Sequence, residues 1–299
     1  VNGFWTHDWY SHAVRVASWG NENGTNNVMR LAAGMPYGVK GTGTLGLRER
    51  RFYVFNLLEE LDAPGEWWID RAAKRLYLYP PTGKPCETDN VLLLISKAPL
   101  LKTVGARHLR FVNLSFEGGY GDGIDVMGDD IRFEGCRVAG FGGLGMRVYG
   151  DRNVLRNVEV CDVGRGGIVV RGGDRRTLRR SDTRVEDCHI HDWAVFQRTS
   201  ADGLRVDGCG VTVRRNRLHD APHTAIGYGG NEHLFEFNDV SRVLLETADA
   251  GAYYTGRDWA SQGNVLRFNY THDLGPGGEH VCTMGFYFDD CDGGDAVYS

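Results

Sequence analysis

Lysine is scarce in this chain and stops early. The 299 residues contain 34 Lys and Arg together, but the last lysine is Lys102. The net charge is −5, and the arginines form no basic patch of the kind that binds nucleic acid. We therefore expect no nucleic-acid partner, and no lysine is present after residue 102 to act as a catalytic base.

Proline, paired cysteine motifs and long apolar runs are also missing. The chain has 8 prolines against 42 glycines, which indicates many tight turns. Its 7 cysteines are odd in number and lack CxxC spacing, so we predict neither a cysteine zinc site nor a complete disulfide framework. The longest apolar run, VLLLISKAPLL, is broken by Lys97 and Pro99, so we expect no membrane span. Because the chain opens on Val1, we expect a secreted or periplasmic protein whose leader has been removed.

Residues 1–89 show no repeat. Residues 67–70 and 75–79 alternate between apolar and polar side chains on either side of a short turn, which is typical of a β-hairpin. We predict an antiparallel, β-rich N-terminal cap or insert for this region.

Residues 90–299 are periodic, with a minimum spacing of 22 residues. One column of equivalent positions reads Leu114, Cys136, Val158, Cys188, Asn216, Asn238 and Asn269. A second column, which opens the next strand, reads Ile124, Met146, Ile168, Leu204, Ile226, Ala252 and Phe286. The segments alternate like strands and lack a 3.6-residue stripe, so the pattern predicts an all-β fold, a right-handed parallel β-helix of at least seven turns with these apolar side chains inside. Since residues 297–299 match the start of another turn, we expect the β-helix to be truncated at Ser299.

The asparagines and histidines of the repeat have structural interpretations. Three asparagines in one column predict a ladder of amide hydrogen bonds along the axis, with Cys136 and Cys188 as buried thiols. Three His-Asp pairs fall at one repeat position, which favours turn chemistry over catalysis. These pairs are His191-Asp192, His219-Asp220 and His272-Asp273.

An acidic residue interrupts a column of glycines near the end of the chain. The column reads Gly128, Gly150, Gly172, Gly208, Gly230 and Gly256, and Asp290 follows in the seventh turn. Repeated glycine indicates a left-handed or crowded backbone, which aspartate tolerates better than most residues. We interpret Asp290, next to Asp289, as a residue whose strained backbone is retained for function. The alternative is a benign substitution.

Other polar residues near this acidic stretch are predicted to share one face. The register places Asp249 one turn above His223, with Asp202 two turns below. Tyr253 and Tyr287 fall on positions expected to face outward, where stacked tyrosines suit sugar rings.

Several segments of the chain match a known family: GFWTHDW, EELDAPGEWWIDRAAKRLYLYPP, the repeated turns, ETADAGAYYTGRDW and FYFDDCDGGD. With these segments the chain resembles bacterial right-handed β-helix proteins of the glycoside hydrolase family 141 type. The resemblance implies hydrolysis of plant cell-wall glycans, of fucoside or xylan type, by a pair of aspartates that match Asp249 and Asp290. The residues expected to contact the carbohydrate substrate are Asp202, His223, Tyr253, Arg257, Tyr287 and Asp289. No cofactor or metal is expected for this chemistry.

Two alternatives remain open at this stage. A straight strand would hold Asp249 and Asp290 farther apart than the roughly 5 to 10 Å of a glycosidase pair. In that case Asp249 with Asp202 or His223 is the better constellation. The other function classes are a β-helix polysaccharide lyase acting on uronates, with Arg257 available as a base and calcium as a possible cofactor, and a non-catalytic glycan-binding β-helix.

Overall fold

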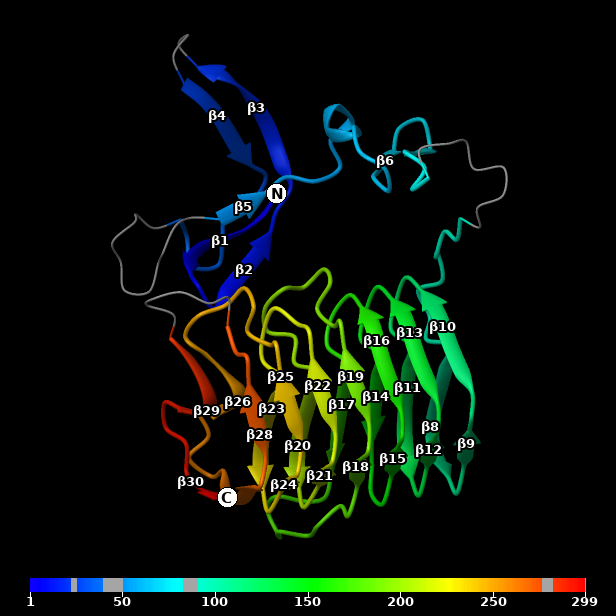
Figure 1. The fold of residues 1–299 in the computed structure, drawn as a ribbon, viewed down its shortest axis with the longest axis vertical. Helices are drawn as coiled ribbons and strands as arrows, with labels where there is room; N and C mark the ends of the chain where they lie inside the picture. The colour runs from blue at the N-terminus through cyan, green and yellow to red at the C-terminus, as the bar shows by residue number, and fades with distance from the viewer. Residues whose placement is uncertain (23–25, 40–50, 83–90, 276–281, 299) are drawn as a thin grey trace. The chain divides into compact units, whose positions relative to one another are not determined.

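The chain divides into two compact units, Val1–Leu93 and Leu94–Ser299, drawn in Figure 1. This computed structural model describes residues 1–22, 26–39, 51–82, 91–275 and 282–298. Nearly all of its regular structure is strand, and the helical structure within these ranges is the 3-10 turn Leu58–Glu60. None of the described residues belongs to a helix long and apolar enough to cross a membrane.

The N-terminal unit contains small antiparallel sheets, as predicted. One sheet has the order β2-β1-β5, and two hairpins are formed by β3 with β4 and by β6 with β7. The bounds are β1 (Asn2–His7), β2 (Tyr10–Ala13), β3 (Val16–Glu22), β4 (Asn26–Leu31), β5 (Arg51–Tyr53), β6 (Trp67–Asp70) and β7 (Arg75–Leu78). The hairpin of β6 and β7 confirms the predicted one, and Asp70 closes its turn by accepting the backbone N–H groups of Ala72 and Ala73.

The second unit is a parallel β-helix, which confirms the predicted fold (Figure 1). Each turn contributes strands to three parallel rows, and every strand pairs with its equivalent in the next turn. The row that forms a separate seven-stranded sheet contains β10 (Ser115–Gly119), β13 (Arg137–Phe141), β16 (Glu159–Val163), β19 (His189–His191), β22 (Arg217–His219), β25 (Asp239–Ser241) and β28 (Tyr270–His272).

The other two rows are joined in one sixteen-stranded sheet. The row that carries the candidate site contains β8 (Leu101–Arg107), β11 (Ile124–Asp129), β14 (Met146–Tyr149), β17 (Ile168–Gly172), β20 (Leu204–Cys209), β23 (Ile226–Asn231), β26 (Ala250–Gly256) and β29 (Thr283–Asp289). The remaining row contains β9 (Arg110–Val112), β12 (Arg132–Glu134), β15 (Val154–Arg156), β18 (Arg184–Glu186), β21 (Thr212–Arg214), β24 (Leu234–Glu236), β27 (Gln262–Arg267) and β30 (Gly294–Tyr298).

The core is the column of apolar side chains inside the stack. Ile124, Met146, Ile168, Leu204 and Ile226 are fully buried, and consecutive members are direct strand partners. Burial of such side chains is the main stabilising term of the fold. The prediction for Leu114 is wrong, because its side chain is 45% exposed. Leu114 belongs to the first turn and therefore packs on only one neighbouring turn.

The predicted asparagine ladder is present. The Asn216 side-chain amide donates to Oδ1 of Asn238 at 2.9 Å, and the Asn238 amide donates to Oδ1 of Asn269 at 2.9 Å. Cys136 and Cys188, in the same column, are buried free thiols. Burial raises the pKa of Cys188 to about 12, so this thiol is an inert part of the core.

Gly208 has a backbone conformation that other residues rarely adopt. Its φ is +102°, and a Cβ placed on it would overlap the carbonyl oxygen of Gly172 in the preceding turn. We expect Gly208→Ala to lower the free energy of unfolding by at least about 2 kcal/mol, measured by chemical denaturation. Gly294→Ala is the control, because no atom lies within 4 Å of its Cβ position. Equal effects of the two substitutions would contradict this interpretation of the glycine column.

Candidate functional site

The register of the stack changes by one residue between β23 and β26. Ile226 pairs with Tyr253, where the repeat predicted Ala252. Ala252 and Tyr253 are both buried, so β26 accommodates one extra residue on its inner side. The later pairs shift accordingly, and Thr283 lies beside Ala250 instead of Asp249.

The predicted role of Tyr253 is therefore wrong. Its side chain is only 1% exposed and stacks on Phe286 inside the core, with ring centroids 4.8 Å apart. Tyr254 takes the outward position, beside Tyr287 on β29. Their rings meet edge to face at 5.6 Å, so an outward tyrosine pair exists one residue further along than expected.

The strain argument for Asp290 is also wrong. Gly256 pairs with Asp289, so Arg257 continues the glycine column and Asp290 is not its first departure from glycine. Arg257 has a φ of +60°, whereas Asp290 is not among the residues with positive φ. The Asp290 side chain is 74% exposed, and its carboxylate lies 4.0 Å from the guanidinium of Arg257. Arg257 is itself 71% exposed and lies at the same distance from Asp289.

Asp249 and His223 have separate partners. Asp249 is exposed, has a φ of +52° and accepts a hydrogen bond from the Tyr287 hydroxyl at 2.9 Å. Nδ1 of His223 lies 3.2 Å from the hydroxyl of Thr247. Burial lowers the pKa of His223 to about 4, so its imidazole is neutral at neutral pH. The expected stacking of Asp249 directly over His223 is replaced by Ala250 in that column.

The register change opens a hollow in the outer face of this row. β20 and β23 pair over six residue positions, whereas β23 and β26 pair over only two. At the end of β23, Asn231 pairs with Gln262 of β27 instead. The resulting cavity has a volume of about 520 Å³. Its lining is mostly polar: Arg171, Gly173, Asp174, Arg175, Arg205, Asp207, Gly208, Tyr228, Gly229, Tyr254, Gly256 and Asp258.

Two glycines on β23 leave room for a carboxylate and a guanidinium at the edge of this hollow. A Cβ on Gly227 would overlap the carboxylate of Asp202, and a Cβ on Gly229 would lie 3.3 Å from Nη2 of Arg205. Nη1 of Arg205 is 3.8 Å from Asp202, and its Nη2 donates to Asp207 at 3.0 Å. The Asp202 side chain is 19% exposed, and burial raises its pKa to about 6.

A second carboxylate, Asp289, lies on the other side of Tyr254. The Tyr254 hydroxyl donates to Oδ2 of Asp289 at 2.7 Å. Burial alone would raise the pKa of Asp289, but hydrogen bonds from Tyr254, from the Asp290 backbone and from Tyr287 lower it below its ordinary value. The face therefore carries one carboxyl with a raised pKa, Asp202, and one with a lowered pKa, Asp289.

Comparisons with known proteins agree with this fold. No family model and no curated protein matches the chain. A solved structure described as a glycoside hydrolase superposes with a TM-score of 0.74 at 14% identity, covering 99% of this chain and 67% of that chain. Tailspike protein 2 from an Escherichia coli O157:H7 bacteriophage, solved at full length, has a TM-score of 0.46 at 12% identity, over 64% of this chain and 25% of that chain. The chain thus has the fold of a structure described as a glycoside hydrolase.

Proposed function

We propose that the β-helix unit hydrolyses glycosidic bonds, with Asp202 as general acid and Asp289 as base. The observation that carries this proposal is the different surroundings of two carboxyl groups on one face: Asp202 is largely buried over Gly227, and Asp289 accepts the Tyr254 hydroxyl, so their pKa values shift in opposite directions. Two carboxyl groups whose environments separate their pKa values are the expected arrangement for acid and base roles. Asp202 would protonate the leaving oxygen, and Asp289 would take a proton from the attacking water.

The spacing of the strands favours inversion of the anomeric centre. The Asp202 carboxylate lies over Gly227 on β23, and Asp289 is on β29, two residues beyond Tyr287, which is in register with Gly227. Two strand spacings, about 10 Å, and two residues along the strand, about 7 Å, therefore separate Gly227 and Asp289. Asp289 reaches back to Tyr254 on the strand between them, which shortens the distance between the carboxyl groups. A separation of roughly 6.5 to 9.5 Å leaves room for the water of an inverting enzyme, whereas retaining pairs are about 5 Å apart.

The two outward tyrosines would bind the sugar. Tyr254 and Tyr287 present ring faces and edges next to Asp289, and Tyr254 pairs with Gly227, the residue that the Asp202 carboxylate covers, which suits a pyranose ring. Asp249 would position the Tyr287 ring through its hydrogen bond. Together with the resemblance stated above, this favours a plant cell-wall glycan of fucoside or xylan type and a bacterial protein that works outside the cytoplasm.

We expect purified protein to add one water per bond cleaved when it is incubated with xylan and fucosylated cell-wall oligosaccharides. Mass spectrometry of the products measures the added water. Proton NMR of the first product formed should report the anomer opposite to that of the substrate. Unchanged oligosaccharides across this panel, together with no binding to them in calorimetry, would contradict the proposal.

A lyase acting on uronate polymers is the second candidate. Arg171 is exposed in the hollow, and within the described ranges it makes no ion pair, so a sugar carboxylate could bind it. Elimination would give an unsaturated uronate with no water gained, which ultraviolet absorbance detects. Detection of that product would assign the protein as a lyase instead of a hydrolase.

A further inference from the structure

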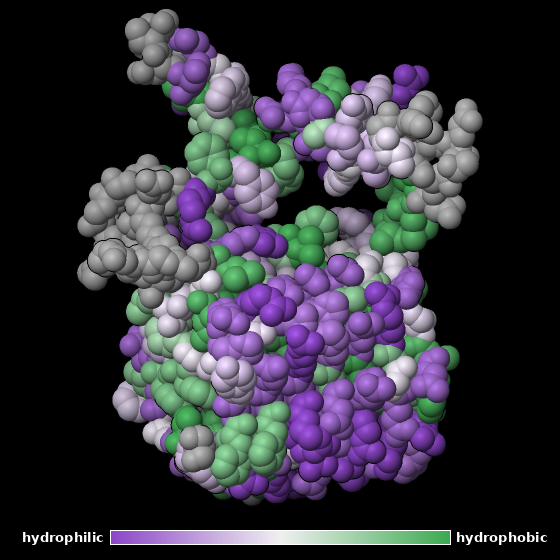
Figure 2. Space-filling model, viewed as in Figure 1, coloured by the Kyte–Doolittle hydropathy of each residue, from purple (hydrophilic) through white to green (hydrophobic). Residues whose placement is uncertain are grey.

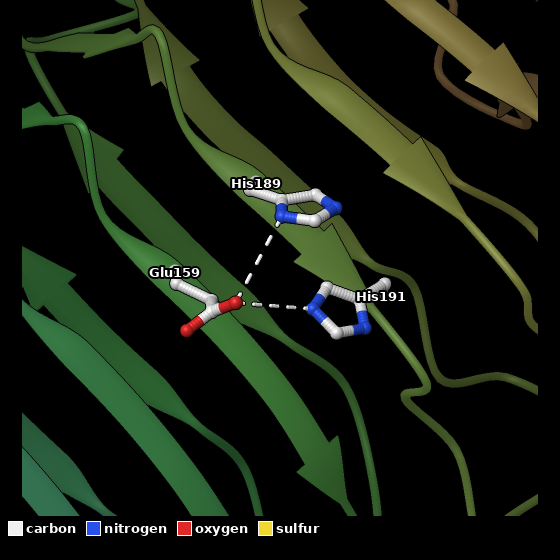
Figure 3. Close-up of side chains that lie close together, drawn as sticks. All are labelled: Glu159, His189 and His191. Carbon is white, nitrogen blue, oxygen red and sulfur yellow. Dashed lines mark hydrogen bonds and ion pairs between the residues drawn. The ribbon is translucent and has the colours of Figure 1, made fainter.

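A histidine cluster lies on the outer face of the seven-stranded sheet, on a different row from the candidate glycan site. Glu159 is on β16, His189 and His191 are on β19, and His219 is on β22. Figure 2 shows that this face of the β-helix is largely hydrophilic. Figure 3 shows Glu159 to one side of the two histidines of β19, with one carboxylate oxygen turned toward both rings. None of these residues has a part in the proposed hydrolysis.

Three ligand atoms converge in this cluster. Nε2 of His191 is 3.5 Å from Oε1 of Glu159, and Nδ1 of His189 is 3.9 Å from the same oxygen. One ligand atom from each of the three residues lies within 4.8 Å of the other two. The 3.5 Å and 3.9 Å distances to Oε1 are at or beyond the limit of a hydrogen bond. They are close to the spacing of about 3.4 Å between two ligands at a tetrahedral angle, given metal–ligand bonds of about 2.1 Å.

Asp192 binds one of the two ring nitrogens of His191. Nδ1 of His191 lies 2.6 Å from a carboxylate oxygen of Asp192, and in the tautomer that donates from Nδ1 to this carboxylate, Nε2 has a lone pair on the side of Glu159, 3.5 Å from Oε1. Arg137 donates to Oε2 of Glu159 at 2.7 Å, which leaves Oε1 as the oxygen that faces the histidines. Hydrogen bonds of this kind orient the ligands of protein metal sites.

A longer chain of hydrogen bonds has the same effect on His189. Nδ1 of His219 lies 2.6 Å from Asp220 and 3.2 Å from Nη2 of Arg242, and its Nε2 lies 2.7 Å from Nε2 of His189. In the tautomer of His219 that donates to Asp220 from Nδ1, its Nε2 accepts from Nε2 of His189. Nδ1 of His189 then has a lone pair on the side of Glu159. Arg242 holds Asp220 from the other side at 2.6 Å.

We propose that Glu159, His189 and His191 bind a divalent transition-metal ion of the Zn²⁺ class. Two imidazole nitrogens and a carboxylate oxygen that face one point attract a cation into the space between them. Two nitrogens and one oxygen suit Zn²⁺ or its neighbours, whereas Mg²⁺ and Ca²⁺ favour oxygen ligands. His189 and Glu159 are 39% and 37% exposed, so water has access to a fourth position.

The third His-Asp pair provides a matched control. Nδ1 of His272 lies 2.7 Å from Asp273, as in the other two pairs, but its Nε2 lies 3.1 Å from Asp239. In the part of the chain that the structure describes, His272 belongs to no group of three metal-ligating side chains. The His-Asp turn pair therefore recurs in the repeat. Among the three His-Asp pairs, only the histidine of the first, His191, lies in a group of converging ligands, together with Glu159 and His189.

The test measures Zn²⁺ binding to tag-free, metal-stripped protein by competition with a chromophoric chelator. Cys282→Ser and Cys291→Ser are introduced first, because these two exposed thiols are competing ligands. We expect one equivalent of Zn²⁺ to bind, and Glu159→Gln or His189→Ala to weaken binding at least about tenfold. His272→Ala should leave the affinity unchanged, and a large excess of Mg²⁺ or Ca²⁺ should not displace the ion.

Circular dichroism and melting curves of the metal-free variants check that each one is folded. Glu159→Gln keeps the size of the side chain, so it serves if His189→Ala fails to fold. The proposal is overturned if the starting protein binds no Zn²⁺, or if His272→Ala weakens binding as much as the ligand substitutions do.

Discussion

Asp202→Asn is expected to reduce turnover at least about a hundredfold, the usual scale for losing a general acid, and to make the protein more stable at alkaline pH. The amide keeps the size of the side chain over Gly227 but cannot protonate a leaving oxygen. Activity is measured on whichever oligosaccharide the wild-type protein cleaves, and stability as the melting temperature between pH 4 and pH 8.

The direction of the stability effect follows from the raised pKa of Asp202. A carboxyl whose folded pKa is about 6, above its ordinary value of 3.8, contributes stability below pH 4 that is lost as pH rises through 6. The variant lacks this loss, so its melting temperature should rise relative to wild type as pH increases. Asp290→Asn is the control and should leave activity near wild type, because that carboxylate is exposed. Normal turnover in Asp202→Asn would eliminate it as the acid.

Asn238→Ala is expected to destabilise the β-helix by about 3 to 5 kcal/mol. Oδ1 of Asn238 accepts the backbone N–H and the side-chain amide of Asn216, and its own amide donates to Val213 and Asn269. Alanine leaves two buried donors of Asn216 without an acceptor and opens a gap in the column. Each unsatisfied buried group costs roughly 1 to 3 kcal/mol.

Chemical denaturation of Asn238→Ala measures this loss. Gln262→Ala is the matched control, since Gln262 is an exposed amide side chain on the nearby strand β27. Its substitution should change the free energy of unfolding by less than about 0.5 kcal/mol. A loss below about 1 kcal/mol for Asn238→Ala would mean that water replaces the ladder without cost.

Most of the fold could be predicted because the repeat is regular up to β23. Ile124 to Ile226 keep one register, and the asparagine column predicts contacts that are more than 20 residues apart in sequence. Leu114 was mispredicted because periodicity identifies the side that faces the axis but not whether another turn covers it. The spacing of the repeat does not show which turn lies at the end of the stack.

The candidate site was predicted only in part. Asp202, Asp289 and Tyr287 were expected near the sugar and lie on the outer face of one row, whereas Asp290 and Tyr253 were placed by a register that is off by one. The sequence does not distinguish a bulged residue in β26 from a loop that is one residue longer, because Ala252 and Tyr253 are both able to face the core.

Arg205 and Tyr254 were missed, although the sequence contained a signal for Arg205. Gly227 and Gly229 alternate on β23, and alternate glycines in a strand indicate that something else occupies the space above it. That occupant is the carboxylate of Asp202 with the guanidinium of Arg205.

The extra residue in β26 has a consequence for how sugar preference can vary. Each turn contacts only its neighbours, so the strand pairing before β23 does not depend on which side chains the later turns direct outward. Tyr254 and Tyr287 face outward, and the backbone pairs beneath them need no particular side chain. Libraries randomised at these two positions should therefore yield folded proteins with altered substrate selectivity, which makes the β26–β29 face a practical starting point for engineering.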